Sequence, residues 1–135
     1  MQVNYTSFEK AVGYNCKNPE KSFYLTDPIF IIVVYANKKI WLKIPCDFTS
    51  DGCTIPKGFR WLIGCPHTGK YLPASLIHDW ILEHPDIVNY NRKLASRIFK
   101  MALLNEGVSP LKAQIMYLAV DIWQAVKNIK TKKWR

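Results

Sequence analysis

The sequence predicts an α+β protein in which a small antiparallel sheet is packed against a bundle of three helices. Two observations support this fold class. The first part of the chain has β-branched and aromatic runs bounded by turn residues, and the second part has helical periodicity with proline and glycine at segment ends. With 135 residues, of which 49% are apolar, the chain can bury one substantial core. We expect a single domain, mainly β over 1–47 and mainly α over 56–127, with a basic tail over 128–135.

Three segments account for the predicted strands. Ser22 to Leu25 is a short candidate, and Ile29 to Tyr35 is a continuous β-branched and aromatic run typical of a strand buried on both faces. Ile40 to Ile44 alternates apolar and polar residues, which indicates one covered face. Because Asn37 tolerates a left-handed backbone, the residues between the last two segments predict a hairpin in a sheet of about three strands.

Prolines and capping residues locate the predicted helices. Pro56 to Ile63 is a short helical or turn segment, and Pro73 to His84 is a helix with proline in its first turn. Asn91 to Asn105 repeats apolar residues at helical spacing before Gly107 stops it. Ser109-Pro110 then opens a long helix. The apolar stripe that we expect to face the core comprises Leu111, Ile115, Leu118, Ala119, Ile122 and Val126.

The chain is strongly basic, with 19 Lys and Arg against 10 Asp and Glu and a net charge of +9. Such a charge attracts nucleic acid, anionic lipid or an acidic protein partner. The densest basic group is at the end of the sequence, where Lys130, Lys132 and Lys133 are candidate binding residues. The aromatic residues lie mostly at core spacing, so the pattern indicates no platform for stacking nucleic-acid bases.

Several classes of protein are excluded by what the sequence lacks. No apolar run reaches the roughly 18 residues of a membrane-spanning helix, and Met1 to Glu9 lacks the layout of a secretory signal, so we expect a soluble intracellular protein. The four cysteines (Cys16, Cys46, Cys53 and Cys65) contain no C-x-x-C pair, which disfavours structural zinc and a disulfide framework. We therefore expect no cofactor from these patterns.

Two loops contain residues that could carry chemistry. Asp51 lies in a turn that Gly52 and Pro56 make rigid, and its carboxylate points either into a cleft or to its own backbone. The glycine-rich segment from Gly64 to Tyr71 only superficially matches a phosphate-binding loop, because Lys70 is not followed by serine or threonine.

The third candidate is the pair His78-Asp79 on the first long helix. His78 lies off the predicted core-facing stripe, which suits a general base, while the structural alternative is a histidine packed between elements. Neighbouring side chains on a helix diverge by about 100°, so Asp79 cannot orient the His78 ring.

An ordered series of motifs resembles a known family. The motifs are Phe48 to Pro56, Phe59 to Gly64, Gly69 to Ala74, His78 to Trp80, Arg92, Phe99, Gly107-Val108 and Met116 to Val120. Together they resemble a phage and prophage family of small proteins catalogued as domain of unknown function 1353. The resemblance implies a viral or prophage gene but no particular reaction.

A second resemblance concerns mechanism. A His-Asp pair after a glycine-rich loop is similar to the phospholipase A2-like pattern, which implies His78 as base and Asp79 as a calcium ligand beside the Gly64 to Gly69 loop. The chain departs from that pattern, because Leu82 replaces a tyrosine and Ser96 replaces the aspartate that orients the histidine. A serine hydroxyl cannot offset the charge of an imidazolium.

Either Asp47 or Asp51 supplies the missing carboxylate, or the chain does not catalyse. We expect the second case, with His78 in a structural role and Arg60, Lys70 and Arg92 as candidate binding residues. Arg60 or Arg92 would then pair with Asp51 or Asp79.

The expected function is that of a phage accessory protein, associated with the virion or tail or interacting with a host factor. It would act without catalysis, in the virion or the host cytoplasm. One alternative is a calcium-dependent phospholipase A2-like hydrolase acting on the host envelope. The other is an anti-defence or nucleic-acid-binding protein that uses its basic C-terminus.

Overall fold

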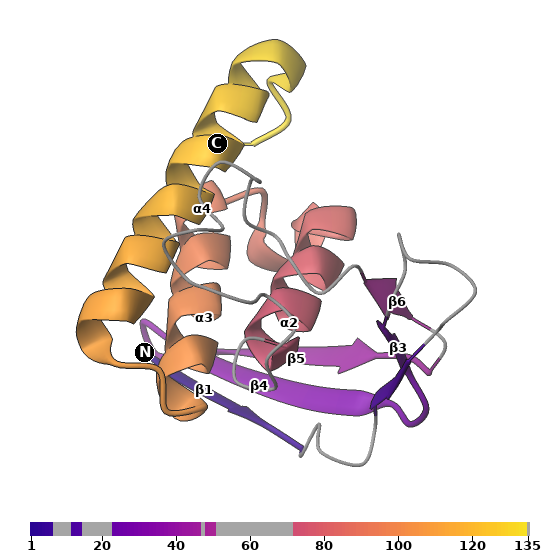
Figure 1. Cartoon of the computed structure of the whole chain (residues 1–135). Helices are drawn as coiled ribbons and strands as arrows, with labels where there is room; N and C mark the ends of the chain where they lie inside the picture. Colours follow the sequence, from indigo (N-terminus) through magenta and orange to yellow (C-terminus); the bar gives the residue numbers. More distant parts are fainter. Residues whose placement is uncertain (7–11, 15–22, 47, 51–71, 135) are drawn as a thin grey trace. The chain divides into compact units, whose positions relative to one another are not determined.

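A computed structural model describes residues 1–6, 12–14, 23–46, 48–50 and 72–134 (Figure 1). The chain forms two compact units, Met1–Gly52 and Cys53–Arg135. The described strands all belong to the first unit and the described helices to the second, which confirms the α+β class with strands before helices. The predicted segment Pro56 to Ile63 lies outside the described residues, and the single domain stays a prediction.

The strand unit contains two antiparallel sheets of three strands each. One has the order β1-β4-β5, formed by Gln2–Tyr5, Ile29–Tyr35 and Lys38–Ile44. The other has the order β2-β3-β6, formed by Val12–Tyr14, Phe23–Leu25 and Thr49–Ser50.

The strand predicted at Ser22 to Leu25 exists as β3, but it is not in the sheet of the hairpin. The third strand of that sheet is β1, which sequence reasoning missed. Only Val3 of β1 is deeply buried, and its neighbours Gln2 and Asn4 are polar and exposed, so the segment carries little apolar signal.

The predicted hairpin is confirmed, with Tyr35 paired directly to Lys38. Its turn consists of Ala36 and Asn37, whose φ angles are 47° and 62°. Two successive left-handed residues define a type I′ turn, which matches the right-handed twist of the strands that it joins. Asn37 thus has the left-handed backbone that the sequence predicts.

The prediction that β4 is buried on both faces is wrong. Ile29, Ile31 and Val33 are at most 1% exposed, whereas Phe30 is 52% exposed. Successive side chains of a strand point to opposite faces, so a sheet with one covered face needs apolar residues only at alternate positions. The continuous apolar run of β4 therefore leaves apolar side chains on its uncovered face.

The helical unit contains α2 (Leu72–Glu83), a short 3₁₀ helix η3 (Pro85–Val88), α3 (Arg92–Asn105) and α4 (Pro110–Thr131). The three predicted long helices are confirmed to within about a residue at their starts. In this unit α3 packs against both α2 and α4. None of the described helices is long and apolar enough to cross a membrane.

The helix ends follow their capping residues. Asn91 accepts a hydrogen bond from the Leu94 amide at 3.2 Å, and Ser109 accepts one from the Lys112 amide at 3.4 Å. Gly107, with a φ of 87°, follows the end of α3. The last helix continues through Thr131, so residues 128–131 of the predicted tail are helical.

The predicted orientation of the last helix is wrong. Its buried residues are Ala113, Met116, Ala119, Val120 and Gln124. Of the stripe predicted to face the core, only Ala119 is buried, while the others are exposed by 39–73%. Both sides of α4 carry apolar residues, so the apolar pattern alone does not indicate which side packs within the helical unit.

Candidate functional site

The uncovered side of the β1-β4-β5 sheet carries a regular array of side chains, which we call the open face. The strand register places Asn4, Ile32 and Trp41 side by side in its middle row. The flanking rows contain the neighbours two positions away along each strand. The open face consists of Gln2, Asn4, Thr6, Phe30, Ile32, Val34, Lys39, Trp41 and Lys43.

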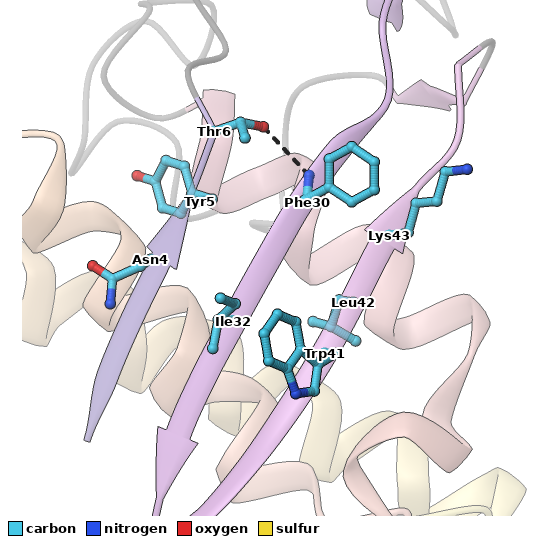
Figure 2. Close-up of a pocket in the computed structure, with 8 residues that line it drawn as sticks. All are labelled: Asn4, Tyr5, Thr6, Phe30, Ile32, Trp41, Leu42 and Lys43. Atoms are coloured by element: carbon cyan, nitrogen blue, oxygen red, sulfur yellow. Dashed lines mark hydrogen bonds between the residues drawn. The ribbon is translucent and has the colours of Figure 1, made fainter.

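A pocket of about 510 Å³ opens on this face (Figure 2). The residues that line it are Asn4, Tyr5, Thr6, Phe30, Ile32, Trp41, Leu42 and Lys43. Its most exposed aromatic side chains are Trp41 at 71% and Phe30 at 52%. This volume falls within the range of pockets that hold small organic groups.

The chemistry of the open face is aromatic and cationic. Lys39 and Lys43 are the exposed neighbours of Trp41 on the same side of β5, because alternate residues share a face. The Lys43 ammonium lies 5.7 Å from the centroid of the Phe30 ring, which is within cation–π range. The nine side chains include no carboxylate. The expectation that the aromatic residues lie at core positions therefore does not hold for Trp41 and Phe30, which are exposed on this face.

Backbone pairing holds the rim of this face in place. The Thr6 amide donates to the Phe30 carbonyl at 3.1 Å, and the Phe30 amide donates to the Thr6 hydroxyl oxygen at 3.3 Å (Figure 2). These two hydrogen bonds extend the pairing of β1 with β4 by one residue. Phe30 thus projects from a backbone that is fixed on both sides.

The second candidate region is in the helical unit. His78 is fully buried, and its ring lies 5.3 Å from that of Phe99 at an angle of 51°. The prediction that His78 lies off the core face of its helix is wrong. Most of α2 is enclosed, as the 4% exposure of Ser75 and the burial of Ile77 indicate, so the helix has no free polar side at this point.

Burial controls the charge of this histidine. Neither ring nitrogen has a hydrogen-bond partner among the residues that the structure describes. Burial lowers the pKa of His78 from 6.5 to about 4, and the charge of Asp121 opposes that shift. The ring is therefore neutral at pH 7, and it has no exposed surface at which a substrate could meet it.

Asp121 is the centre of a hydrogen-bonded group contributed by two helices. Its Oδ1 accepts from Arg92 Nη1 at 2.5 Å, and the same nitrogen donates to the Asp121 carbonyl at 2.9 Å. The Ser96 hydroxyl lies 3.1 Å from Oδ1. The side chains of Arg92 and Asp121 are only 17% and 16% exposed. We call Arg92, Ser96 and Asp121 the α3–α4 polar cluster.

This cluster bears on the comparison with the phospholipase A2-like pattern. Ser96 occupies the position of the expected aspartate, and its hydroxyl contacts a carboxylate from the next helix. Among the described residues, the carboxylate that acts electrostatically on His78 is Asp121. The predicted alternatives, Asp47 and Asp51, lie outside the described residues. Sequence reasoning missed Asp121, although a signal was present: it is the only acidic residue in the 22 residues of α4.

Other predicted site residues are distributed as follows. Asp79 is half-buried beside His78, and Arg92 has its ion pair with Asp121. Lys130, Lys132 and Lys133 are exposed at the end of α4, whereas Asp47, Asp51, Arg60, Lys70 and the loop over 64–69 lie outside the described residues. In the described part of the chain, no group of three or more His, Cys, Asp or Glu residues is arranged to hold a metal ion. The calcium role of Asp79 stays a prediction.

Comparison with known proteins identifies the family. The chain belongs to the family described as "Protein of unknown function (DUF1353)", whose model matches residues 29–120. The match includes β4 and β5, and so it includes most of the open face.

The chain is also similar to the "Uncharacterized protein y4jT" of Sinorhizobium fredii (strain NBRC 101917 / NGR234), with 34% identity over 89 residues. Those residues are 66% of this chain and 26% of the relative, so the chain spans about a quarter of that protein's length. No solved structure matches the chain.

Proposed function

We propose that the chain is a non-enzymatic accessory protein that binds single-stranded nucleic acid on the open face of its sheet. The observation that carries this proposal is the exposure of Trp41 and Phe30 between lysines, on a face without carboxylates. Every unpaired base has a flat apolar surface that stacks on an aromatic ring, at about 1–3 kcal/mol per base. Lysines beside the rings would contact the phosphates.

Single strands fit this face better than duplexes do. Stacking on Trp41 or Phe30 requires bases that are already unpaired. Asn4 and Thr6 add an amide and a hydroxyl at the rim, where they could hydrogen-bond base edges. A duplex would offer only its phosphates to Lys39 and Lys43, so its binding would be weaker and wholly salt-dependent.

The burial of His78 supports the non-enzymatic part of the proposal. A general base must come within hydrogen-bond reach of the proton that it removes, and this ring is enclosed by protein. The phage accessory role, in the virion or the host cytoplasm, remains part of the proposal on the strength of the sequence resemblance.

The test is binding of a fluorescein-labelled oligo(dT) to the full chain, followed by anisotropy at several salt concentrations. Trp41→Ala should weaken binding about tenfold or more, because one stacking contact is lost. Lys39→Glu with Lys43→Glu should weaken it further and reduce the salt dependence. The matched control is Trp123→Ala, which removes a partly exposed tryptophan from the helical unit and should leave binding unchanged.

Two outcomes would contradict the proposal. One is the absence of binding at low salt. The other is undiminished binding by Trp41→Ala together with loss of binding on deletion of residues 130–135, which would assign the nucleic acid to the basic C-terminus.

The calcium-dependent hydrolase remains as an alternative, and a thermal melt tests it. If Asp79 binds calcium, millimolar Ca²⁺ should raise the melting temperature and Asp79→Asn should remove that gain. We expect no shift in either protein. A calcium-dependent shift that Asp79→Asn abolishes would favour the hydrolase.

A further inference from the structure

Helix α4 has two apolar sides that face in opposite directions. One side is buried in the helical unit and includes Ala113 at 0% and Met116 at 1%. Ile122 lies about 180° around the helix from Ala113, at about 100° per residue, and is 56% exposed. An exposed apolar strip along a helix marks an interaction surface, because monomeric proteins rarely leave a large apolar patch uncovered.

The exposed side has the spacing of a coiled-coil seam. Steps of four and three residues alternate along it through Leu111, Ile115, Leu118, Ile122, Ala125 and Ile129, which we call the α4 seam. Leu111 and Ile129, at its two ends, are 73% and 74% exposed. The seam covers roughly 27 Å of helix at 1.5 Å per residue. Such spacing allows the side chains of one helix to fit between those of another.

We propose that the α4 seam binds the α4 seam of a second copy of this chain, with the two helices antiparallel. The spacing reads the same in both directions, so a two-fold axis between Leu118 and Ile122 brings the seam onto itself. Leu118 then faces Ile122 of the second copy, and Leu111 faces Ile129 of the second copy. Both contacts are made twice in the dimer.

Charge favours this antiparallel arrangement. The helix ends with Lys127 and Lys130, and Lys132 and Lys133 follow directly. Parallel helices would bring two such basic ends together, whereas antiparallel helices place them at opposite ends of the dimer. In this antiparallel register Lys112 lies level with Asn128 of the second copy, so no lysine faces a lysine across the seam.

The borders of the seam distinguish a second copy from other occupants. One border carries Lys112 and Lys130, but the other carries Gln114, Asp121 and Asn128. A helix that lies on an anionic membrane, or binds an acidic helix, typically has lysines on both borders. On this helix, Gln114 accepts a hydrogen bond from Lys100 and Asp121 is paired with Arg92, so the second border presents little free charge.

The test is the oligomeric state of the full chain by analytical ultracentrifugation. We expect a dimer whose Kd rises at least about 100-fold in Leu118→Lys, because the change buries two charges at the two-fold axis. The matched control is Thr131→Lys, which adds the same charge to an exposed position on the other side of α4 and should leave the dimer intact. Circular dichroism would verify that both variants fold.

Two further measurements test the occupant and the register. Salt should strengthen the dimer, because two chains of charge +9 repel one another. In a Leu111→Cys, Ile129→Cys variant, mass spectrometry should find a disulfide between these two positions. They are roughly 27 Å apart on one helix, so that disulfide must join two copies.

The opposite results would overturn the proposal. A chain that stays monomeric at about 100 μM has no such dimer; if that monomer sediments with phosphatidylserine vesicles, the seam binds lipid instead. A dimer that is unaffected by Leu118→Lys uses another surface. Disulfides joining residue 111 to residue 111 would indicate parallel helices.

Discussion

The strand unit and the helical unit place their reactive side chains in opposite ways. In the helical unit, His78 and Asp121 lie among packed helices, where they are mostly shielded from solvent. In the strand unit, Trp41 and the lysines beside it are open to a ligand. A histidine in a helix is a common catalytic candidate, but among the described residues His78 is enclosed while Trp41 is exposed. Variants of the two units should therefore separate stability from binding.

The largest expected effect is acid sensitivity due to His78. Its pKa falls from 6.5 to about 4 on folding, so the unfolded chain binds more protons between those pH values. Stability is then greatest above pH 6.5, and about 3 kcal/mol of it should be lost as the pH falls to 4. Urea unfolding at a series of pH values would measure this slope.

The control for the pH dependence is His78→Leu, which should remove most of this slope. Asp121, Arg92 and Asp79 are unchanged in that variant, so the comparison isolates the imidazole. Burial raises the pKa of Glu106, which favours stability at low pH and opposes the His78 effect. Since Glu106 is present in both proteins, an equal slope in both would contradict the assignment to His78.

His78→Ala should lower the free energy of unfolding by about 1–3 kcal/mol, since it removes the packing of the ring against Phe99. The same variant should bind oligo(dT) as the wild type does. Trp41→Ala should show the reverse, with binding reduced and stability changed by less than about 0.5 kcal/mol. Unchanged stability of His78→Ala with loss of activity would instead make His78 a catalytic residue.

The ion pair between Arg92 and Asp121 should contribute a smaller amount. A double-mutant cycle with Arg92→Ala and Asp121→Ala should give a coupling energy of about 1 kcal/mol, because the pair is only partly desolvated. Chemical denaturation of the four proteins measures it. Oligo(dT) binding should not change in any of them, and a coupling energy of zero would mean that the pair has no net effect on stability.

The smallest effect concerns the hairpin that carries Trp41. Ala36 has a left-handed backbone, which costs an L-residue roughly 1 kcal/mol, whereas glycine adopts it freely. Ala36→Gly should therefore stabilise the chain by about 0.5 kcal/mol after the entropy lost by glycine on folding is subtracted. Asn37→Ala should destabilise it. Equal stability of all three proteins would mean that the turn conformation is not strained.

The predictions that the structure confirms rest on local sequence signals. The predictions that were wrong depend on contacts between residues far apart in the sequence. Asn91, Gly107 and Ser109 act on backbone within a few residues, so the helix ends could be read from the sequence. Which side of β4 or α4 is covered depends on segments far away along the chain. The pairing of Asp121 with Ser96 spans 25 residues. That Asp121 is the only acidic residue of α4 marks it as unusual, but does not indicate its partner.

The same limit explains how the candidate site was missed. Phenylalanine and tryptophan are residue types that usually lie in a protein core. Only the strand register shows that Phe30 and Trp41 share an uncovered face. The basic C-terminus, by contrast, is conspicuous in the sequence because its lysines are consecutive or nearly so. The basic tail could therefore be recognised from the sequence, whereas the aromatic face is recognised only from the pairing between strands.

The position of β5 has a practical consequence. In the described part of its sheet, β5 is an outermost strand, and it carries Lys38, Lys39 and Lys43. Charged side chains on an edge strand discourage another sheet from pairing with its free backbone groups. Replacing these lysines by neutral residues would remove that protection and invite aggregation, which could be mistaken for a change in affinity. Reversing their charge to glutamate keeps the edge guarded.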